Sequence, residues 1–358
     1  MEIVQPTLAG GIRTDTPKEP LLTNPPTLIP TATQIQAVVS PTSALPPTFT
    51  APATLKPSTI SGLEQIGLIE YAPWDLVLAA AWSPSGDQIA VAAGESIYLY
   101  TNDLVQQGRL VAGDWTTSLA FHPQGIWLAS GGRDGQMRIW DVEKQSLILE
   151  LAAHKKGVNA VAFSPDGRVL ATAGNDAVAR LWDPSTGENL AQMIGGTYAV
   201  PSIAFSQDGS DLAITNGGLI RIRDVESSRF VHTLINDVTN YSIARSPDGN
   251  LLASGSTAGN IFLWDLSSGA SPEAIPLVAE PGAAPSSLIW SVAFSPDGAL
   301  LAASDNAGFI YFWDVNEKKF LTSRSSTSWG ITSLTFSPDG RYLVSGGLDG
   351  VLRLWAVR

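Results

Sequence analysis

The sequence contains no cysteine among its 358 residues. A chain without cysteine forms no disulfide, offers no thiolate nucleophile and holds no cysteine-ligated zinc or iron-sulfur cluster. Composition therefore leaves the redox compartment open while excluding these kinds of chemistry.

Charged residues are also scarce, at 15% of the chain, against roughly 25% in an ordinary soluble domain. The 33 acidic side chains exceed the 21 basic ones, which gives a formal net charge of -12. Binding to a phosphate backbone requires clustered Lys and Arg. The charge balance therefore argues against nucleic acid as a partner.

Long apolar runs are missing as well. No segment approaches the roughly 18 consecutive apolar residues that a membrane helix needs, and residues 1–30 lack a basic segment followed by an apolar one. We expect no membrane span and no export signal within the sequence as given.

Proline and threonine are concentrated in residues 1–60, which hold 11 of the 24 prolines. This segment offers too little apolar surface to offset the entropy of ordering it. We expect a disordered, extended tether over residues 1–60. It is electrically neutral, so the whole charge of -12 belongs to residues 61–358. Because Thr/Pro-rich stalks occur on exported proteins, the tether favours an extracytoplasmic or cell-surface location, with the cytoplasm as the alternative.

A short turn recurs seven times after residue 60, and its glycines are 39, 42, 42, 40, 49 and 42 residues apart. Such a period indicates one supersecondary unit used repeatedly. The seven turns are Ser83-Pro-Ser-Gly86, His122-Pro-Gln-Gly125, Ser164-Pro-Asp-Gly167, Ser206-Gln-Asp-Gly209, Ser246-Pro-Asp-Gly249, Ser295-Pro-Asp-Gly298 and Ser337-Pro-Asp-Gly340.

Each unit predicts several antiparallel strands. In the third unit, an apolar run over 158–163 leads into the turn, and further runs follow over 169–172 and 178–182. Pro and Gly favour the tight hairpin between the first two runs, and the remaining residues suffice for a fourth strand. Four strands in about 42 residues form one propeller blade, and seven blades close a ring. The predicted fold class is therefore all-β.

The third run of the units resembles the end of a WD40 repeat. It closes on Trp140-Asp141, Trp182-Asp183, Trp264-Asp265 and Trp313-Asp314, and on the altered pairs Tyr100-Thr101, Arg223-Asp224 and Trp355-Ala356. The resemblance covers residues 65–358 and is closest to bacterial-type repeats. It implies a seven-bladed propeller at 61–358 that binds a protein or peptide without catalysis and without a cofactor.

The resemblance also implies a buried hydrogen-bonded set within a blade. Only the third repeat carries all four of its members, which are His154, Thr172, Asp176 and Trp182. A catalytic role for His154 and Asp176 is weighed against this structural role, and we favour the structural role.

The final repeat ends at a third strand, so another segment is needed to complete the last blade. WD40 rings commonly use an N-terminal strand for this purpose. We therefore predict that residues 65–71 pair beside Val351 to Trp355. Removal of residues 1–72 should then destabilise the ring, whereas removal of 1–58 should be tolerated.

Partner contacts in the family recur six and four positions before the aromatic that ends the inner strand. Several of these positions carry aromatic residues, which would form a rim. Further candidates lie one position away from them, or directly before the acidic residue of the turn that follows the second strand. Aromatic and Arg residues often anchor interfaces. Individual aromatics could instead cover the channel. The residues that we expect to bind a partner are Trp115, Arg133, Asn159, Tyr198, Tyr241, Trp290 and Trp329.

Two other functions remain as alternatives. A metal-dependent propeller hydrolase or lactonase would need acidic ligands near the channel, for which Asp75, Asp114 and Asp237 are weak candidates. A glycan-binding propeller would use the aromatic rim. We expect no catalytic residue and no metal site, and the sequence leaves the oligomeric state open.

Overall fold

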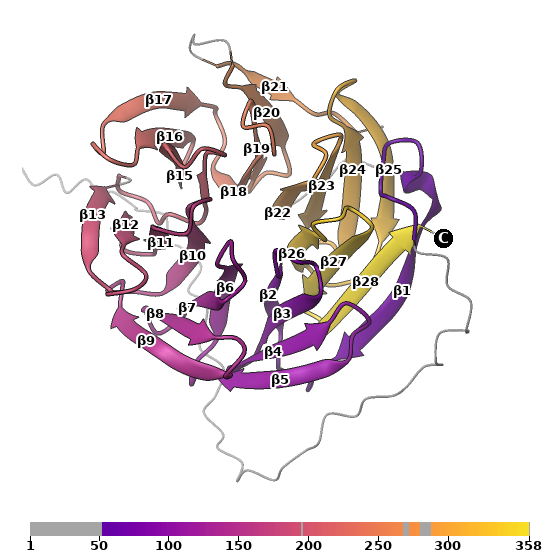
Figure 1. Ribbon diagram of the computed structural model, residues 1–358. Coiled ribbons are helices and arrows are strands. Elements are labelled where there is room, and N and C mark those ends of the chain that lie inside the picture. Colours follow the sequence, from indigo (N-terminus) through magenta and orange to yellow (C-terminus); the bar gives the residue numbers. More distant parts are fainter. Residues whose placement is uncertain (1–51, 195, 268–271, 280–287, 358) are drawn as a thin grey trace, which may run out of the picture. The chain divides into compact units, whose positions relative to one another are not determined.

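The computed structural model describes residues 52–194, 196–267, 272–279 and 288–357. Two compact units divide the chain, Met1–Gln36 and Ala37–Arg358, and the described residues all belong to the second. The segment expected to be disordered therefore falls largely outside the described residues. The described residues form seven four-stranded antiparallel sheets arranged in a ring (Figure 1). The chain is a seven-bladed β-propeller.

Blades are numbered here along the chain, with strands given from the axis outward. The first blade consists of β2 (Val77–Trp82), β3 (Gln88–Ala93), β4 (Ser96–Thr101) and β5 (Gln106–Val111), and the second of β6 (Thr116–Phe121), β7 (Trp127–Gly132), β8 (Gln136–Asp141) and β9 (Ser146–Ala152). The third blade consists of β10 (Val158–Phe163), β11 (Leu170–Gly174), β12 (Val178–Trp182) and β13 (Asn189–Ile194), and the fourth of β14 (Ile203–Phe205), β15 (Asp211–Asn216), β16 (Leu219–Asp224) and β17 (Phe230–Ile235).

The last three blades complete the ring. The fifth blade consists of β18 (Asn240–Arg245), β19 (Leu251–Ser256), β20 (Ile261–Asp265) and β21 (Ala274–Pro276), and the sixth of β22 (Ile289–Phe294), β23 (Leu300–Asp305), β24 (Phe309–Asp314) and β25 (Lys319–Ser325). The seventh blade consists of β26 (Ile331–Phe336), β27 (Tyr342–Gly347), β28 (Val351–Val357) and β1 (Leu63–Glu70). A single turn of 3-10 helix, η1 (Ile60–Gly62), precedes β1.

The repeated turn shapes each blade at its inner hairpin. In the third blade, Ser164 Oγ donates to Asp166 Oδ1 at 2.7 Å and accepts from the Val169 amide at 2.9 Å. Gly167 has φ +75°, a left-handed conformation that glycine adopts without a steric cost. The side chains and the glycine together fix the hairpin, which sets the register of the first two strands.

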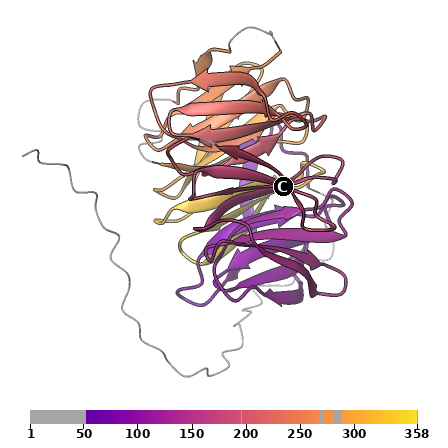
Figure 2. The ribbon, with the colours of Figure 1, turned by 90° about the vertical axis from the view of Figure 1, so that its left-hand side faces the viewer.

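Apolar side chains of neighbouring blades pack together and form the core. Between the seventh and first blades, Val344 and Leu352 pack with Val77 and Ile89, and all four are fully buried. Figure 2 shows the strands crossing the ring from one face to the other. Successive antiparallel strands therefore place their connections alternately on the two faces.

An N-terminal strand completes the seventh blade. β1 pairs antiparallel with β28, with Glu70 beside Val351 and Leu63 beside Val357 (Figure 1). The segment expected at residues 65–71 thus lies mostly within β1, which begins two residues earlier. The ring is closed by hydrogen bonds between strands from the two ends of the described chain.

The boundary expected at residue 60 is wrong, because residues 52–60 pack on the seventh blade. Ala53 forms a bridge with Val357, and the Leu55 amide donates to the Gly340 carbonyl at 2.7 Å. Leu55 and Ile60 are buried in the same cluster as Leu343. Removal of residues 1–58 would therefore take away a core side chain, contrary to the expectation that this truncation is tolerated.

Candidate functional site

The two faces of the ring differ in their connections. The links between blades and the turns between second and third strands lie on one face, which we call the upper face. The Ser-Pro-Asp-Gly turns and the turns between third and fourth strands lie on the other, the lower face.

Inner strands carry a β-bulge near the upper face. The pairing with the second strand skips one residue in six of the seven blades, and each skipped residue lies four positions before the end of the inner strand. A bulge leaves one residue unpaired and redirects its side chain. The skipped residues are Leu78, Thr117, Asn159, Tyr241, Trp290 and Thr332.

These side chains converge on a cavity of about 190 Å³ at the axis, which we call the central cavity. The fourth blade contributes Pro201 from the matching position, so every blade supplies one residue. Ser202 and Ser242 complete the lining. The bulged position, rather than the position two residues earlier, therefore forms the central site.

Several lining residues also tie neighbouring blades together. Asn159 Nδ2 donates to the Val200 carbonyl of the fourth blade at 3.1 Å and to Asn175 Oδ1 at 2.9 Å. Thr117 Oγ1 donates to the Gly131 carbonyl at 2.9 Å and also to the Val158 carbonyl of the third blade. These bonds hold the lining in place before any partner arrives, which reduces the entropy lost on binding.

Tyr241 and Trp290 form the aromatic side of the central cavity. Their rings meet edge to face, with centroids 5.2 Å apart and an interplanar angle of 86°. Trp290 Nε1 donates to Asn306 Oδ1 at 3.0 Å, which fixes the indole. Burial raises the pKa of the Tyr241 hydroxyl, so this group stays protonated at neutral pH and can donate a hydrogen bond.

Ser242 offers a second polar group to an occupant of the central cavity. Serines at the corresponding position accept a backbone amide of the next inner strand, as Ser202 Oγ does from Ile243 at 3.2 Å. Ser242 Oγ is buried and has no hydrogen-bond partner among the residues that the structure describes. Sequence reasoning missed this residue, since a serine near an inner strand gives no sign of its unused hydroxyl.

The other four predicted contact residues lie outside the central cavity. Trp115 immediately precedes β6, and its carbonyl accepts from the Arg133 amide at 2.9 Å. Tyr198 and Trp329 lie in the links before β14 and β26 and are 65% and 61% exposed. These four residues belong to connections of the upper face, whereas Asn159, Tyr241 and Trp290 are brought together at the axis.

Trp74 is a further exposed aromatic that sequence reasoning missed. It lies in the link between β1 and β2 and is 83% exposed. A tryptophan in an inter-blade link was the available signal, but its position does not match the two contact positions of the repeat. The structure adds it to the aromatics of the upper face.

The four residues of the third-blade set are hydrogen-bonded in a chain. His154 Nδ1 lies 2.7 Å from Asp176 Oδ1, and its Nε2 lies 2.9 Å from Thr172 Oγ1. Trp182 Nε1 donates to Thr172 Oγ1 at 2.9 Å. Burial lowers the pKa of His154, although Asp176 opposes this shift. The imidazole is fully buried between protein groups.

A metal-dependent function would need several ligands in one place. Within the described ranges, no group of three or more His, Asp and Glu side chains could hold a metal ion, and Asp75, Asp114 and Asp237 form no such group. Among the described residues, no helix is long and apolar enough to cross a membrane.

Comparisons with known proteins agree with this architecture. A family model described as the IFT122 first beta-propeller matches residues 115–358. A "Target of rapamycin complex subunit wat1" of Schizosaccharomyces pombe is 27% identical over 188 residues, which cover 51% of this chain and 46% of that protein.

Two further matches are shorter. A "p21-activated protein kinase-interacting protein 1-like" of Danio rerio is 34% identical over 80 residues, 22% of each chain. An "Anaphase-promoting complex subunit cdh1" of Dictyostelium discoideum is 38% identical over 84 residues, 22% of this chain and 11% of that protein. The matched segments thus span less than half the length of these relatives.

Proposed function

Because the chain belongs to the WD40 β-propeller family, we propose that it is a non-catalytic scaffold that presents its upper face to partner proteins or peptides. The relatives support this role, since two of them are named as subunits of larger complexes and one as a kinase-interacting protein. The resemblance covers the propeller and leaves the partner open.

The observation that carries the proposal is the convergence of one side chain from each blade on the central cavity. A volume of about 190 Å³ suits a single inserted side chain of a peptide rather than a whole drug-sized ligand. The edge-to-face pair of Tyr241 and Trp290 supplies the apolar contact. The hydroxyls of Tyr241 and Ser242 supply hydrogen bonds that orient the inserted group.

The exposed aromatics around the cavity would extend the contact. Trp74, Tyr198 and Trp329 are each more than 60% exposed in the links of the upper face. Aromatic residues and Arg provide a large share of binding energy at interfaces, which supports contact roles for Trp115 and Arg133 as well. The net charge of -12 favours a neutral or basic partner.

Affinity capture from native extract, followed by mass spectrometry, tests the proposal. Tyr241→Ala/Trp290→Ala removes the aromatic side of the central cavity, and Trp115→Ala/Trp329→Ala removes two outer aromatics. Phe230→Ala is the matched control, because Phe230 is a 57% exposed aromatic on the outermost strand β17.

Loss of the same captured proteins in both upper-face variants, with retention in the Phe230→Ala control, is the expected result. Circular dichroism and melting curves must show that each variant stays folded. Full retention in both upper-face variants would move the interface to the lower face or the outer edge and refute the proposal.

A further inference from the structure

The fifth blade breaks a rule that the other six obey. Their inner strands end on an aromatic residue, whereas β18 ends on Arg245. The aromatics at this position are Trp82, Phe121, Phe163, Phe205, Phe294 and Phe336. The repeats therefore provide six internal references for one exceptional side chain.

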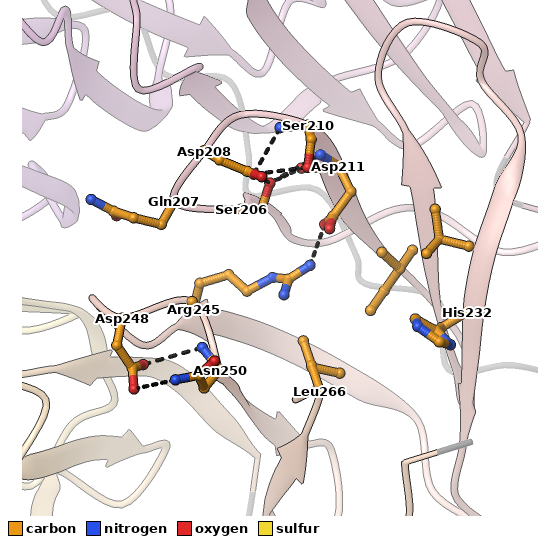
Figure 3. Close-up of a pocket in the computed structure, with 13 residues that line it drawn as sticks. Ser206, Gln207, Asp208, Ser210, Asp211, His232, Arg245, Asp248, Asn250 and Leu266 are labelled. Carbon is orange, nitrogen blue, oxygen red and sulfur yellow. Dashed lines mark hydrogen bonds and ion pairs between the residues drawn. The ribbon is translucent and has the colours of Figure 1, made fainter. Parts of the chain in front are cut away.

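A second exception faces the first across the blade boundary. In the other blades, the aromatic packs near the first residues of the second strand of the preceding blade, as Trp82 does on Tyr342 with ring centroids 6.1 Å apart. Between the fourth and fifth blades, Asp211 occupies that place at the start of β15. Arg245 Nη2 donates to Asp211 Oδ1 (Figure 3). An ion pair thus replaces an apolar contact.

A third exception lies beside this pair in the lower-face turn. Six turns carry proline at their second position, and the fourth turn carries Gln207. At most other blade boundaries, that proline lies against the glycine of the turn in the next blade. Pro165 of the third blade, for example, lies so close to Gly209 of the fourth that a Cβ placed on Gly209 would be 3.3 Å from Pro165 Cδ. Gln207 brings an amide to the same location. Three departures from the repeat therefore meet at one blade boundary.

These departures surround a cavity of about 430 Å³, which we call the lower-face cavity. Its volume falls within the range of small-molecule sites, about 300–1,000 Å³. Ile222, Val231 and Leu266 form its apolar wall. Asp211, His232 and Arg245 contribute polar groups (Figure 3).

The guanidinium of Arg245 is incompletely satisfied. Its side chain is only 8% exposed, and Nε is buried without a hydrogen-bond partner among the residues that the structure describes. Burial lowers the pKa of Arg245 and raises the pKa of Asp211, although each opposes the other's shift. Because the buried Nε–H of Arg245 lacks an acceptor within the described chain, an additional polar partner beside this guanidinium would be stabilising.

We propose that the lower-face cavity binds a small, neutral, polyhydroxylated ligand of monosaccharide size. A hydroxyl group both donates and accepts, so one hydroxyl can accept from the Arg245 guanidinium while another donates to Asp211. The apolar wall receives the C–H face of such a ligand. This site is separate from the upper face and does not depend on the proposed scaffold function.

Charge at the cavity argues against ionic ligands. Asp208 and Asp248 lie in the two turns that border it and join Asp211 as a third carboxylate, so an anion is repelled. A cation would be attracted by these carboxylates but would compete with the guanidinium of Arg245 for Asp211. A neutral ligand avoids both penalties and also the cost of burying a further charge.

Saturation-transfer difference NMR on the full chain tests this proposal, with glucose, galactose, mannose, ribose and myo-inositol as probes. Asp211→Leu/Arg245→Phe replaces the ion pair by an apolar pair like those at most other blade boundaries and removes both charged groups from the cavity. We expect at least one probe to receive saturation from the wild type, and its signal to fall at least tenfold in the double variant. Tyr241→Ala/Trp290→Ala is the matched control and should retain the signal.

A second measurement follows Arg245 itself in the wild-type protein. Addition of the bound probe to wild-type protein should shift the side-chain Nε–H resonance of Arg245, assigned by its absence from an Arg245→Lys sample. The proposal is overturned by absence of saturation for every probe, by equal signals in the wild type and the double variant, or by an unmoved Arg245 resonance. Stronger binding of acetate or of guanidinium in the same assay would also overturn it.

Discussion

Trp313 follows Ala303 by ten residues, and this alanine leaves the buried indole N–H of Trp313 without an acceptor among the described residues. At the same spacing, Trp182 donates to Thr172 at 2.9 Å and Trp264 to Ser254 at 3.0 Å. The sixth blade thus has the tryptophan of the set but lacks its hydroxyl.

Ala303→Ser should therefore stabilise the protein by about 1 kcal/mol, because it supplies an acceptor to a buried donor. Chemical unfolding in urea measures the change. Ala302→Ser adds the same atom one residue away and should destabilise the protein, since Ala302 is fully buried among apolar side chains. Equal stabilities for the two variants would contradict the assignment.

The ion pair between the fourth and fifth blades should show strong coupling. Asp211→Leu leaves a buried guanidinium without its carboxylate, which costs about 3–5 kcal/mol. Addition of Arg245→Phe should recover this loss or exceed it, because replacement of a buried ion pair by apolar residues is often neutral or stabilising. Unfolding free energies of the two single variants, the double variant and the wild type give the coupling. Additive effects would show that the two side chains act independently.

Stability should depend on pH through His154. Its pKa is lowered from 6.5 in the folded protein, so the unfolded chain binds the proton more readily. Stability is therefore fully present above pH 6.5 and falls as the pH decreases toward the folded pKa, by at most about 1.4 kcal/mol per pH unit. His122 contributes in the same direction, since burial lowers its pKa as well.

His154→Gln separates the contribution of His154 to the pH dependence of stability from that of His122. The variant should be less stable at pH 7.5, because Thr172 and Asp176 lose a hydrogen-bond partner, and its stability should decline less between pH 7 and pH 5. Unfolding curves at several pH values provide the test. An unchanged slope would assign the pH dependence to other groups.

Leu55 should contribute to the stability of the closed ring. Leu55→Ala should cost about 2–5 kcal/mol, the range for a fully buried leucine. Leu68→Ala is the matched control on β1, where the side chain is 42% exposed and should cost much less. Similar losses in both variants would mean that residues 52–60 do not pack on the blade in solution.

The sequence predicted the seven-bladed ring because each repeat carries its own turn and its own terminal tryptophan or substitute. Three of the residues that it proposed as partner contacts, Asn159, Tyr241 and Trp290, line the central cavity. It did not distinguish the two contact positions of each repeat, since the bulge that redirects one of them depends on strand register.

Two other structural features could not be predicted from the sequence, each for a different reason. Leu55 lies in a Thr/Pro-rich context, and its burial depends on a surface formed only after the seventh blade assembles. The pairing of Arg245 with Asp211 joins two repeats, so neither residue reveals it alone. A comparison of the seven inner strands would have exposed Arg245 as the exceptional residue.

The pairing of β1 with β28 also constrains the order of folding. These strands are separated by almost the whole described chain, so their contact forms late, after the intervening blades have shortened the distance between them. The same seam should open first under denaturing conditions, and hydrogen exchange should be fastest there among the strands of the seventh blade. The strand that completes the ring is thus also the natural starting point for its unfolding.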